Sequence, residues 1–248
     1  MDLRPYKEKY LRRRVAVRLR ATGCAGLEEY VSLLKREEDE VERLVLCLTI
    51  HVSTFFRNPS TFQAVETKVF PVLFAASSSG PLRFRSVGCA RGEEPYSLAM
   101  LVREHLGGRS GRREVRIEAI DIDEKVLSEA RGGVYRRSRL KGLDPSLEKK
   151  YFTGNGSCRL VPEIRNMVTF RRGDVLTDLP EGTFDFVLCR NLLIYIEREA
   201  QEKIVENFSR VLRPGGFLAL GRTEVLVGSA RESFEVVDAR ERIYRKAG

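Results

Sequence analysis

The segment with the clearest chemical meaning runs Ser86-Val-Gly-Cys-Ala-Arg-Gly-Glu-Glu-Pro-Tyr-Ser97. An apolar run ends at Val87, glycines follow at 88 and 92, and two glutamates open a helical pattern. Because glycines let bare backbone approach a ligand, a strand that turns into a helix in this way suits a nucleotide-like cofactor. The carboxylates of Glu93 and Glu94 would repel a pyrophosphate at this helix N-terminus but suit a ligand with a cationic end. S-adenosylmethionine (AdoMet) is such a ligand; the alternative is an ordinary turn whose acidic pair complements the helix dipole.

Further polar residues follow other predicted strands, and ligands of open α/β sheets bind at the carboxyl ends of the strands. Asp121 ends the second predicted strand, where a carboxylate can hold both ribose hydroxyls. Asp174 and Val175 follow the third and could serve an adenine, although Asp174 could equally be a cap or turn residue. Arg190-Asn191 follows the fourth. These clusters, and the absence of a complete G-x-G-x-x-G fingerprint, favour AdoMet over NAD.

The elements that must position these residues alternate between short apolar strands and helices. We expect strands at 83–87, 115–120, 167–171, 184–189, 216–221, 234–237 and 242–244, and helices at 93–106, 123–131 and 197–212. The last two strands lie close together, so they should form an antiparallel hairpin. Such alternation predicts an α/β fold with a mostly parallel, Rossmann-like sheet that ends in this hairpin, the plan of AdoMet-dependent methyltransferases. Arg83 and Arg85 make the first strand unfavourable by composition.

Two segments fall outside this alternation. Residues 1–56 are predicted to form a basic all-helical domain, with helices at about 5–20, 26–36 and 39–51, and residues 57–248 the AdoMet-binding domain. Asn58 is expected to cap a helix that starts at Pro59. Within the second domain, residues 132–168 contain Gly-Asn-Gly between short apolar pieces, which predicts a small inserted β-subdomain with a hairpin.

Composition limits the class of protein. Of the 248 residues, 42% are hydrophobic and 32% charged, which is ordinary for a soluble globular protein. Five cysteines without CxxC spacing and only two histidines argue against a zinc site or a disulfide framework and favour a reducing cytoplasm. The longest apolar runs are far shorter than the roughly 18 residues that a membrane span needs. We therefore expect a soluble, cytoplasmic protein without a metal site.

Most of the net charge of +9 lies at the N-terminus. Residues 1–20 carry eight basic and two acidic residues, a net charge of +6. Leu11, Val15 and Leu19 recur every four residues, which predicts a helix whose apolar stripe is flanked by arginines. Such a helix should meet nucleic acid, an anionic membrane or an acidic protein surface. The alternative is a solvated basic face without a partner.

Five blocks of the sequence resemble the chemotaxis receptor methyltransferases, the CheR family. They are Ser53-Thr-Phe-Phe-Arg57, Gly88-Cys-Ala-Arg-Gly-Glu-Glu-Pro-Tyr-Ser97, Asp121-Ile-Asp123, Phe184-Asp-Phe-Val-Leu-Cys-Arg-Asn-Leu-Leu-Ile-Tyr195, and Pro214-Gly-Gly216 through Glu224. The resemblance covers nearly the whole chain. It implies a protein-glutamate O-methyltransferase that transfers a methyl group from AdoMet to glutamates on the cytoplasmic helical bundle of chemoreceptors, leaving S-adenosylhomocysteine (AdoHcy). We expect a monomer that neither binds nucleic acid nor inserts into a membrane.

The resemblance also implies the site residues. The cofactor contacts would be His51, Ser53, Arg57, Gly88, Glu93, Asp121, Asp174, Val175, Arg190 and Asn191. Arg57 and Tyr195 would lie beside the reacting methyl group. Because receptor methylation helices are rich in glutamate, the basic N-terminal helix would steer association with them. The arginines concerned are Arg12, Arg13, Arg14, Arg18 and Arg20.

Some positions depart from the family pattern. His51 stands where the family usually has Asn, and Ala90-Arg91 where it has Ser-Thr. Arg91 would either meet the ammonium of AdoMet or point to solvent. The inserted subdomain is shorter than in members that dock on a receptor's C-terminal pentapeptide, which argues against that mode of recognition. Two alternatives stay open: a non-catalytic AdoMet-binding sensor or scaffold, suggested by Arg91 and His51, and a nucleic-acid methyltransferase, suggested by the basic charge.

Overall fold

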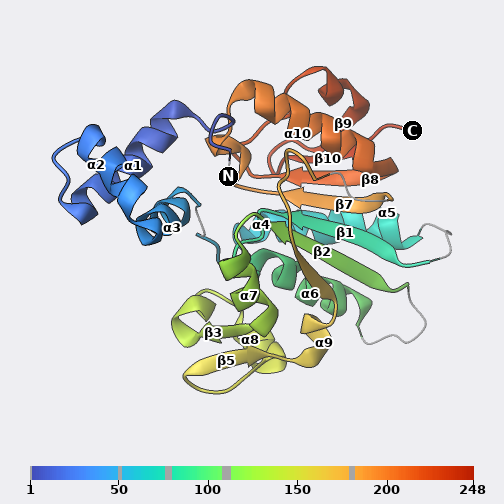
Figure 1. The fold of residues 1–248 in the computed structure, drawn as a ribbon. Helices are drawn as coiled ribbons and strands as arrows, with labels where there is room; N and C mark the ends of the chain where they lie inside the picture. Colours follow the sequence, from blue (N-terminus) through green and yellow to red (C-terminus); the bar gives the residue numbers. More distant parts are fainter. Residues whose placement is uncertain (1, 50–51, 76–79, 108–112, 179–181) are drawn as a thin grey trace.

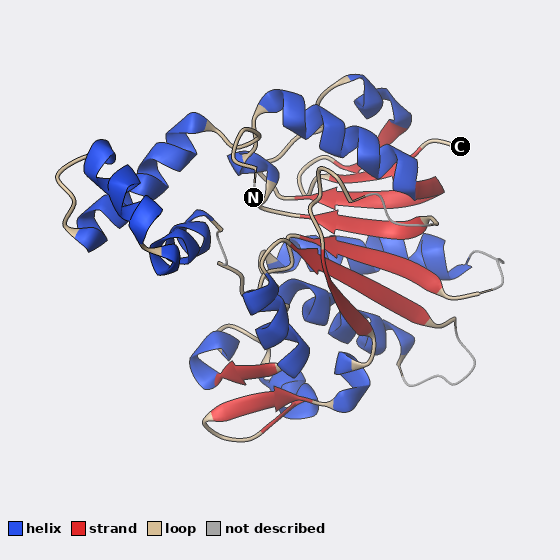
Figure 2. Cartoon of the chain, in the orientation of Figure 1, coloured by secondary structure: helices blue, strands red, loops and turns tan. Residues whose placement is uncertain are grey.

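A seven-stranded sheet forms the centre of the molecule (Figures 1 and 2). The computed structural model describes residues 2–49, 52–75, 80–107, 113–178 and 182–248. The strand order is β6-β2-β1-β7-β8-β10-β9, with parallel pairing from β6 to β8 and antiparallel pairing of β10 with both β8 and β9. The bounds are β1 (Leu82–Val87), β2 (Val115–Asp121), β6 (Val168–Arg172), β7 (Phe184–Cys189), β8 (Leu212–Leu220), β9 (Phe234–Asp238) and β10 (Ile243–Lys246). The predicted mostly parallel sheet with a terminal hairpin is confirmed.

Side chains that alternate along the strands contribute to two hydrophobic cores, one on each face of the sheet. On one face, Phe84 and Phe186 pack with α4 (Pro59–Ala64), a π-helical turn (Val65–Val69), α5 (Phe70–Ala75), α6 (Glu93–Leu106) and α7 (Glu124–Gly132). On the other, Val187 packs with Ile204 and Phe208 of α10 (Arg198–Val211). Side chains that alternate across a strand can supply both cores only if helices cover both faces, as they do here.

The predicted strand at 216–221 begins earlier, at Leu212. Leu212 pairs with Phe184 and Phe217 with Phe186, so the register shifts and residues 213–216 bulge out of the ladder. Proline and glycine are tolerated at such a bulge, which is why Pro214 does not end β8.

The N-terminal helices form a separate lobe that faces the carboxyl edge of the sheet (Figure 1). They are α1 (Glu8–Thr22), α2 (Leu27–Arg36) and α3 (Glu38–Leu48). The first helix begins later than predicted because Tyr6 instead forms an isolated antiparallel bridge with Ile196. Glu40, in the acidic first turn of α3, is buried and accepts hydrogen bonds from Arg18 and Tyr30. The all-helical character of the N-terminal segment is confirmed.

The inserted segment folds as a three-stranded antiparallel sheet of order β3-β5-β4, which confirms the β-subdomain. Its elements are β3 (Val134–Arg136), a 3-10 turn (Arg137–Leu140), α8 (Pro145–Tyr151), β4 (Phe152–Thr153), β5 (Ser157–Leu160) and α9 (Pro162–Arg165). The predicted hairpin joins β4 to β5 through Gly154, whose φ of 96° suits glycine. Two further 3-10 turns span Leu193–Tyr195 and Ser229–Ser233. No helix within the described residues is long and apolar enough to cross a membrane.

Candidate cofactor and active site

One pocket lies at the carboxyl edge of the sheet, beside the N-terminal lobe. Four of the five parallel strands contribute to its lining, through Gly88 after β1, Asp121 at the end of β2, Asp174 and Val175 after β6, and Arg190, Asn191 and Tyr195 after β7. Tyr6, Tyr10, Leu48 and Thr49 line it from the N-terminal segment. The structure thus brings together seven of the residues singled out in the sequence. Ser53, Arg57 and Glu93 are not in this lining, and His51 lies outside the described residues.

Asp121 fastens the glycine loop to the end of β2. Its Oδ2 accepts a hydrogen bond from Ala90 N at 2.8 Å and its Oδ1 one from Asp123 N at 3.1 Å. Gly88 and Ala90 have positive φ values of 68° and 49°. A left-handed alanine is strained, by about 1–3 kcal/mol, and such residues gather at functional sites. The loop is therefore held in one conformation, with the carboxylate of Asp121 at the pocket wall.

Glu93 is a buried carboxylate without a hydrogen-bond partner. It begins α6, its relative exposure is 0%, and neither carboxylate oxygen accepts a hydrogen bond. Arg139 Nη1 lies 3.7 Å from Oε1, beyond hydrogen-bond distance. Burial raises the pKa of Glu93 to about 7. Since a buried carboxylate without hydrogen bonds is costly, the site is suited to a ligand that brings a positive charge and a donor.

Arg190 joins three segments from a buried position, its side chain being 1% exposed. Its Nη2 donates to Arg57 O at 2.7 Å and to Asn58 Oδ1 at 3.0 Å, and its Nη1 to Glu94 Oε2 at 3.2 Å. Glu94, which the site assignment omitted, also accepts from Ser86 Oγ at 3.0 Å. The guanidinium of Arg190 is thus engaged with the protein, and it fixes the 57–58 segment against α6.

The predicted capping role of Asn58 is wrong. Asn58 occupies the N-cap position of α4, but its side chain makes no cap hydrogen bond and accepts from Arg190 instead. The hydrogen bond from the buried guanidinium is charge-assisted, so it is stronger than the bond that this amide oxygen would accept from a backbone N–H at the helix cap. Asn58 and Phe56 both have positive φ values, 59° and 49°.

Ser53 and Arg57 lie half-buried in the segment that leads into α4. Arg57 Nη1 donates to Val52 O at 2.9 Å. Ser97 Oγ, on α6, accepts from Phe56 N at 2.8 Å, which ties this segment to the helix that Glu93 begins. Arg57 is therefore anchored by its backbone to Arg190 and by its neighbour to α6.

Tyr195 lies between the carboxyl edge of the central sheet and the N-terminal segment. Its ring centroid lies 4.8 Å from that of Tyr10, and its carbonyl accepts from Lys7 N at 2.9 Å. Glu197 N donates to Pro5 O at 2.7 Å, which continues the connection. Tyr6 and Tyr10 were missed as pocket residues because the N-terminal segment was interpreted only by its charge and apolar stripe. Two tyrosines at a spacing of four residues were the available signal.

Glu224 is a further residue missed by the site assignment, although it closes the last block of the resemblance. Its relative exposure is 3%. Its Oε2 accepts from Gly221 N at 2.6 Å and Asn191 N at 2.9 Å, and its Oε1 from Ile194 N at 3.4 Å. Burial raises the pKa of Glu224, and the backbone donors oppose that rise. The carboxylate holds the 191–195 loop, which carries Tyr195, against the end of β8.

Arg91 and the two neighbouring cysteines take no part in the pocket lining. Arg91 Nε pairs with Glu129 Oε2 on α7 at 2.7 Å, so its side chain points away from the pocket. Burial raises the pKa of the Cys89 and Cys189 thiols well above the usual range. A thiol in that state is a poor nucleophile, so neither cysteine is suited to covalent catalysis.

The N-terminal arginines are not equivalent. Arg18 forms a bidentate pair with buried Glu40, with Nη2 to Oε2 at 2.7 Å, so it belongs to the interior of the helical lobe. Arg12 pairs with Glu8 at 2.6 Å on the surface, and Arg14 lies over the ring of Tyr10. Arg13 and Arg20 are exposed.

The sheet order with its terminal hairpin, the acidic residue at the end of β2 and the buried carboxylate at the glycine loop together define an AdoMet-dependent methyltransferase. Residues 51–243 match the family model described as "CheR methyltransferase, SAM binding domain", and residues 1–49 the one described as "CheR methyltransferase, all-alpha domain". The chain therefore belongs to the CheR methyltransferase family, and its cofactor is AdoMet.

Curated relatives cover most of the chain. A chemotaxis protein methyltransferase of Listeria monocytogenes is 34% identical over 93% of this chain and 86% of its own length. One of Salmonella typhimurium is 35% identical over 93% of this chain and 80% of its own length. A probable biofilm formation methyltransferase of Pseudomonas putida, WspC, is 33% identical over 89% of this chain and 51% of its own length.

Proposed function

We propose that this protein esterifies glutamate side chains on the cytoplasmic helical bundle of chemoreceptors. Family membership and the relatives named as chemotaxis protein methyltransferases support the receptor as the methyl acceptor. The observation that supports a carboxylate acceptor is Arg57, a half-buried cation that donates to Val52 O and whose backbone is fixed by Arg190. A substrate glutamate with a pKa near 4.3 is already ionised at pH 7, so its esterification needs no general base.

The residues at the carboxyl edge fit AdoMet. Asp121 would hold the ribose hydroxyls, Asp174 and Val175 the adenine, and Glu93, with its two unpartnered oxygens, the ammonium group. The remaining contacts carried over from the family are His51, Ser53, Arg57, Gly88, Arg190 and Asn191. When bound, AdoMet supplies an electrophilic methyl group on its sulfonium, to which the substrate carboxylate forms a C–O bond as the C–S bond breaks.

The chain's own residues would orient the substrate and exclude water. Arg57 would direct the incoming carboxylate through a charge-assisted hydrogen bond, and Tyr195 would form the wall against which it lies. Alignment of this kind can lower the activation free energy of a reaction by about 7–11 kcal/mol. Arg57 is suited to the task because Arg190 and Ser97 fix the backbone on either side of it.

The test is methyl transfer from radiolabelled AdoMet to membranes that carry candidate chemoreceptors. Alkali should release the label as methanol, because glutamate methyl esters are labile to base. Arg57→Ala should lower kcat at saturating receptor by about tenfold or more, as expected for a lost charge-assisted hydrogen bond. Arg91→Ala is the matched control, since Arg91 points away from the pocket, and it should retain activity.

Two results would contradict the proposal. Label that resists alkali would indicate another acceptor, such as an amine or a nucleic acid base. AdoMet binding without transfer to any receptor would favour the sensor or scaffold.

A further inference from the structure

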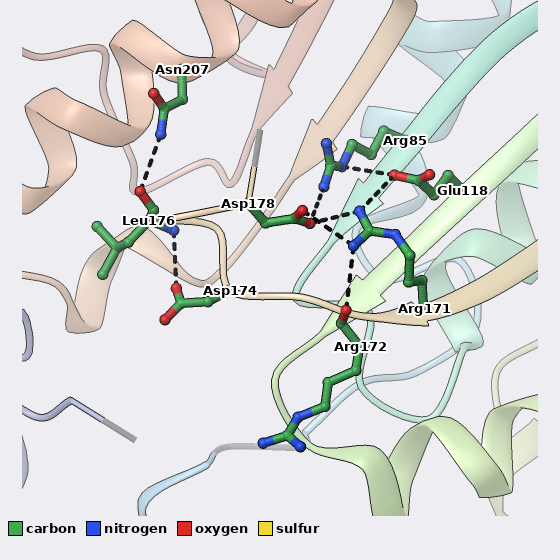
Figure 3. Close-up of polar contacts among 8 residues, drawn as sticks. All are labelled: Arg85, Glu118, Arg171, Arg172, Asp174, Leu176, Asp178 and Asn207. Atoms are coloured by element: carbon green, nitrogen blue, oxygen red, sulfur yellow. Dashed lines mark hydrogen bonds and ion pairs between the residues drawn. The ribbon is translucent and has the colours of Figure 1, made fainter. Parts of the chain in front are cut away.

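Four charged side chains form a network on the face of the sheet that α10 covers only in part (Figure 3). Asp178 lies at its centre, in the connection from β6 to β7. Arg171 of β6 grips its carboxylate with two nitrogens, Nη1 to Oδ1 at 3.1 Å and Nη2 to Oδ2 at 2.7 Å. Arg85 of β1 adds Nη2 to Oδ2 at 2.8 Å. Glu118 of β2 lies between the two arginines, 3.4 Å from Arg85 Nε and 3.5 Å from Arg171 Nη2.

The network explains why a central strand carries a buried arginine. Arg85 has a side chain only 4% exposed, in the middle of the sheet. As far as it is described, the connection from β6 to β7 contains turns and no helix. Two carboxylates therefore take the place that the apolar face of a covering helix usually occupies. A buried arginine is stable there because its charge is paired.

Asp178 ends a turn whose other end carries two pocket residues. Asp178 N and Thr177 N both donate to Asp174 O, at 2.7 and 3.1 Å, and Leu176 N donates to Asp174 Oδ1 at 2.9 Å. The side chain of Asn207 on α10 donates to Leu176 O at 3.4 Å (Figure 3). The turn is thus closed on itself, and the arginines hold its last residue to the sheet.

Gly173 makes room for this arrangement. A Cβ atom at that position would lie 2.5 Å from Asp178 Oδ2, which is closer than atoms can approach. Gly173 N in turn donates to Asp121 O at 3.0 Å. The start of the turn is therefore tied to the end of β2, and the carboxylate of Asp178 packs directly against it.

We propose that Asp178 is a positioning residue for the cofactor. By joining the turn to Arg85 and Arg171, it sets where Asp174 and Val175 stand at the pocket wall, and so determines how well the site recognises the amino group of adenine. This inference rests on the proposed assignment of the adenine to Asp174 and Val175. Asp178 does not line the pocket; it acts through the turn that it closes.

The test measures binding of two ligands, AdoHcy and its hypoxanthine analogue S-inosylhomocysteine, which lacks the amino group. In the wild type, AdoHcy should bind more tightly. Asp178→Asn should raise the Kd for AdoHcy by about tenfold and leave the Kd for the analogue nearly unchanged, since the lost positioning affects one charge-assisted hydrogen bond. In turnover, KM for AdoMet should rise while kcat at saturation stays near the wild-type value.

Asp185→Asn is the matched control. Asp185 also pairs with an arginine, Arg213 Nε at 2.7 Å, and is more buried than Asp178, but it lies on β7 near the strand's amino end. The Asp185→Asn substitution should lower the melting temperature and leave the ratio of the two Kd values unchanged. Arg171→Lys replaces Asp178→Asn as the test variant if Asp178→Asn does not fold. The lysine keeps the positive charge but cannot form the bidentate pair with Asp178, and folding should tolerate the change because the Arg171 side chain is 42% exposed. This variant should reduce the ratio in the same direction.

Three outcomes would overturn the inference, and they differ in what else they affect. If the wild type binds both ligands equally, the adenine assignment fails and the role of Asp178 fails with it. If the wild type discriminates and Asp178→Asn discriminates equally well, Asp178 is structural only. If Asp185→Asn loses discrimination as well, the effect reflects general loosening of the sheet. None of these results bears on whether glutamate is the methyl acceptor.

Discussion

At the scale of single residues, two carboxylates at the same edge of the sheet are prepared for different tasks. Asp121 accepts a backbone hydrogen bond at each oxygen, so its negative charge is stabilised before any ligand arrives. Glu93 accepts none and is fully buried, so its neutral form is favoured. The ionised form of a carboxylate such as Glu93, buried and without hydrogen bonds, is stabilised most when a cation binds beside it.

This difference predicts a pH-dependent stability. The pKa of Glu93 is about 7 in the folded protein and the ordinary value near 4.5 in the unfolded chain. Between these values the folded state binds more protons, so the contribution of Glu93 to stability is fully present below pH 4.5 and is lost as pH rises through 7. The loss is on the order of 3 kcal/mol. Urea titrations of the wild type and Glu93→Gln should show it, because the variant lacks this slope.

Saturating AdoHcy provides the functional arm of the same experiment. Its ammonium group should stabilise the ionised carboxylate, so the slope with pH should shrink in the wild type and stay unchanged in the variant. Glu129→Gln is the control, since Glu129 is exposed on α7 and should behave as the wild type does. Parallel curves for the wild type and Glu93→Gln without ligand would show that folding does not raise the pKa of Glu93.

At the scale of elements, the loop after β7 depends on a carboxylate from the loop after β8. Glu224→Gln replaces an acceptor of three backbone N–H groups by an amide that can turn a donor toward them. We expect the free energy of unfolding to fall by about 1–3 kcal/mol, and kcat to fall as well because Tyr195 is on the loop. Denaturation and methyl-transfer rates measure the two effects.

Glu241→Gln separates these two effects. Glu241 is equally buried and accepts a hydrogen bond from Thr61, away from the pocket. It should lose stability without a matching loss of kcat. If both variants lose activity in proportion to stability, the loop has no special dependence on Glu224.

Elements were easier to predict from the sequence than the contacts between them. Alternating apolar runs indicated the strands, and polar clusters at their ends indicated a shared edge, because both patterns are local. The role of Arg190 was not local, because its partners Asn58 and Glu94 are distant in sequence. The hydrogen bond from Arg190 occupies the Asn58 side chain, which therefore does not cap the helix as predicted. Arg85 looked unfavourable for the same reason, since Asp178 lies 93 residues away.

At the scale of the whole molecule, the N-terminal lobe carries a basic first helix, since residues 1–20 have a net charge of +6, and it also forms a wall of the pocket. Tyr6 and Tyr10 reach the site from it, and Lys7 binds the loop that carries Tyr195. A partner that docks on this lobe would therefore be brought next to the reacting groups. The sequence indicated the charge but not this contact, because the contact depends on how the lobe sits on the sheet.

The exposed arginines of the lobe should set the rate of encounter with an acidic receptor helix. Reversing Arg13 and Arg20 to Glu should raise KM for the receptor by roughly threefold or more at low salt, weaken its salt dependence and spare kcat, because surface charges act mainly on association. Initial rates across a series of salt concentrations measure all three quantities. The same reversal at exposed Arg231 and Arg245, near the terminal hairpin, changes the net charge equally. If that control raised KM as much, total charge would account for the effect. If neither variant did, the basic face would have no part in substrate binding. Arg18 is unsuitable for this comparison, since its reversal would place two carboxylates together beside buried Glu40 and unfold the lobe.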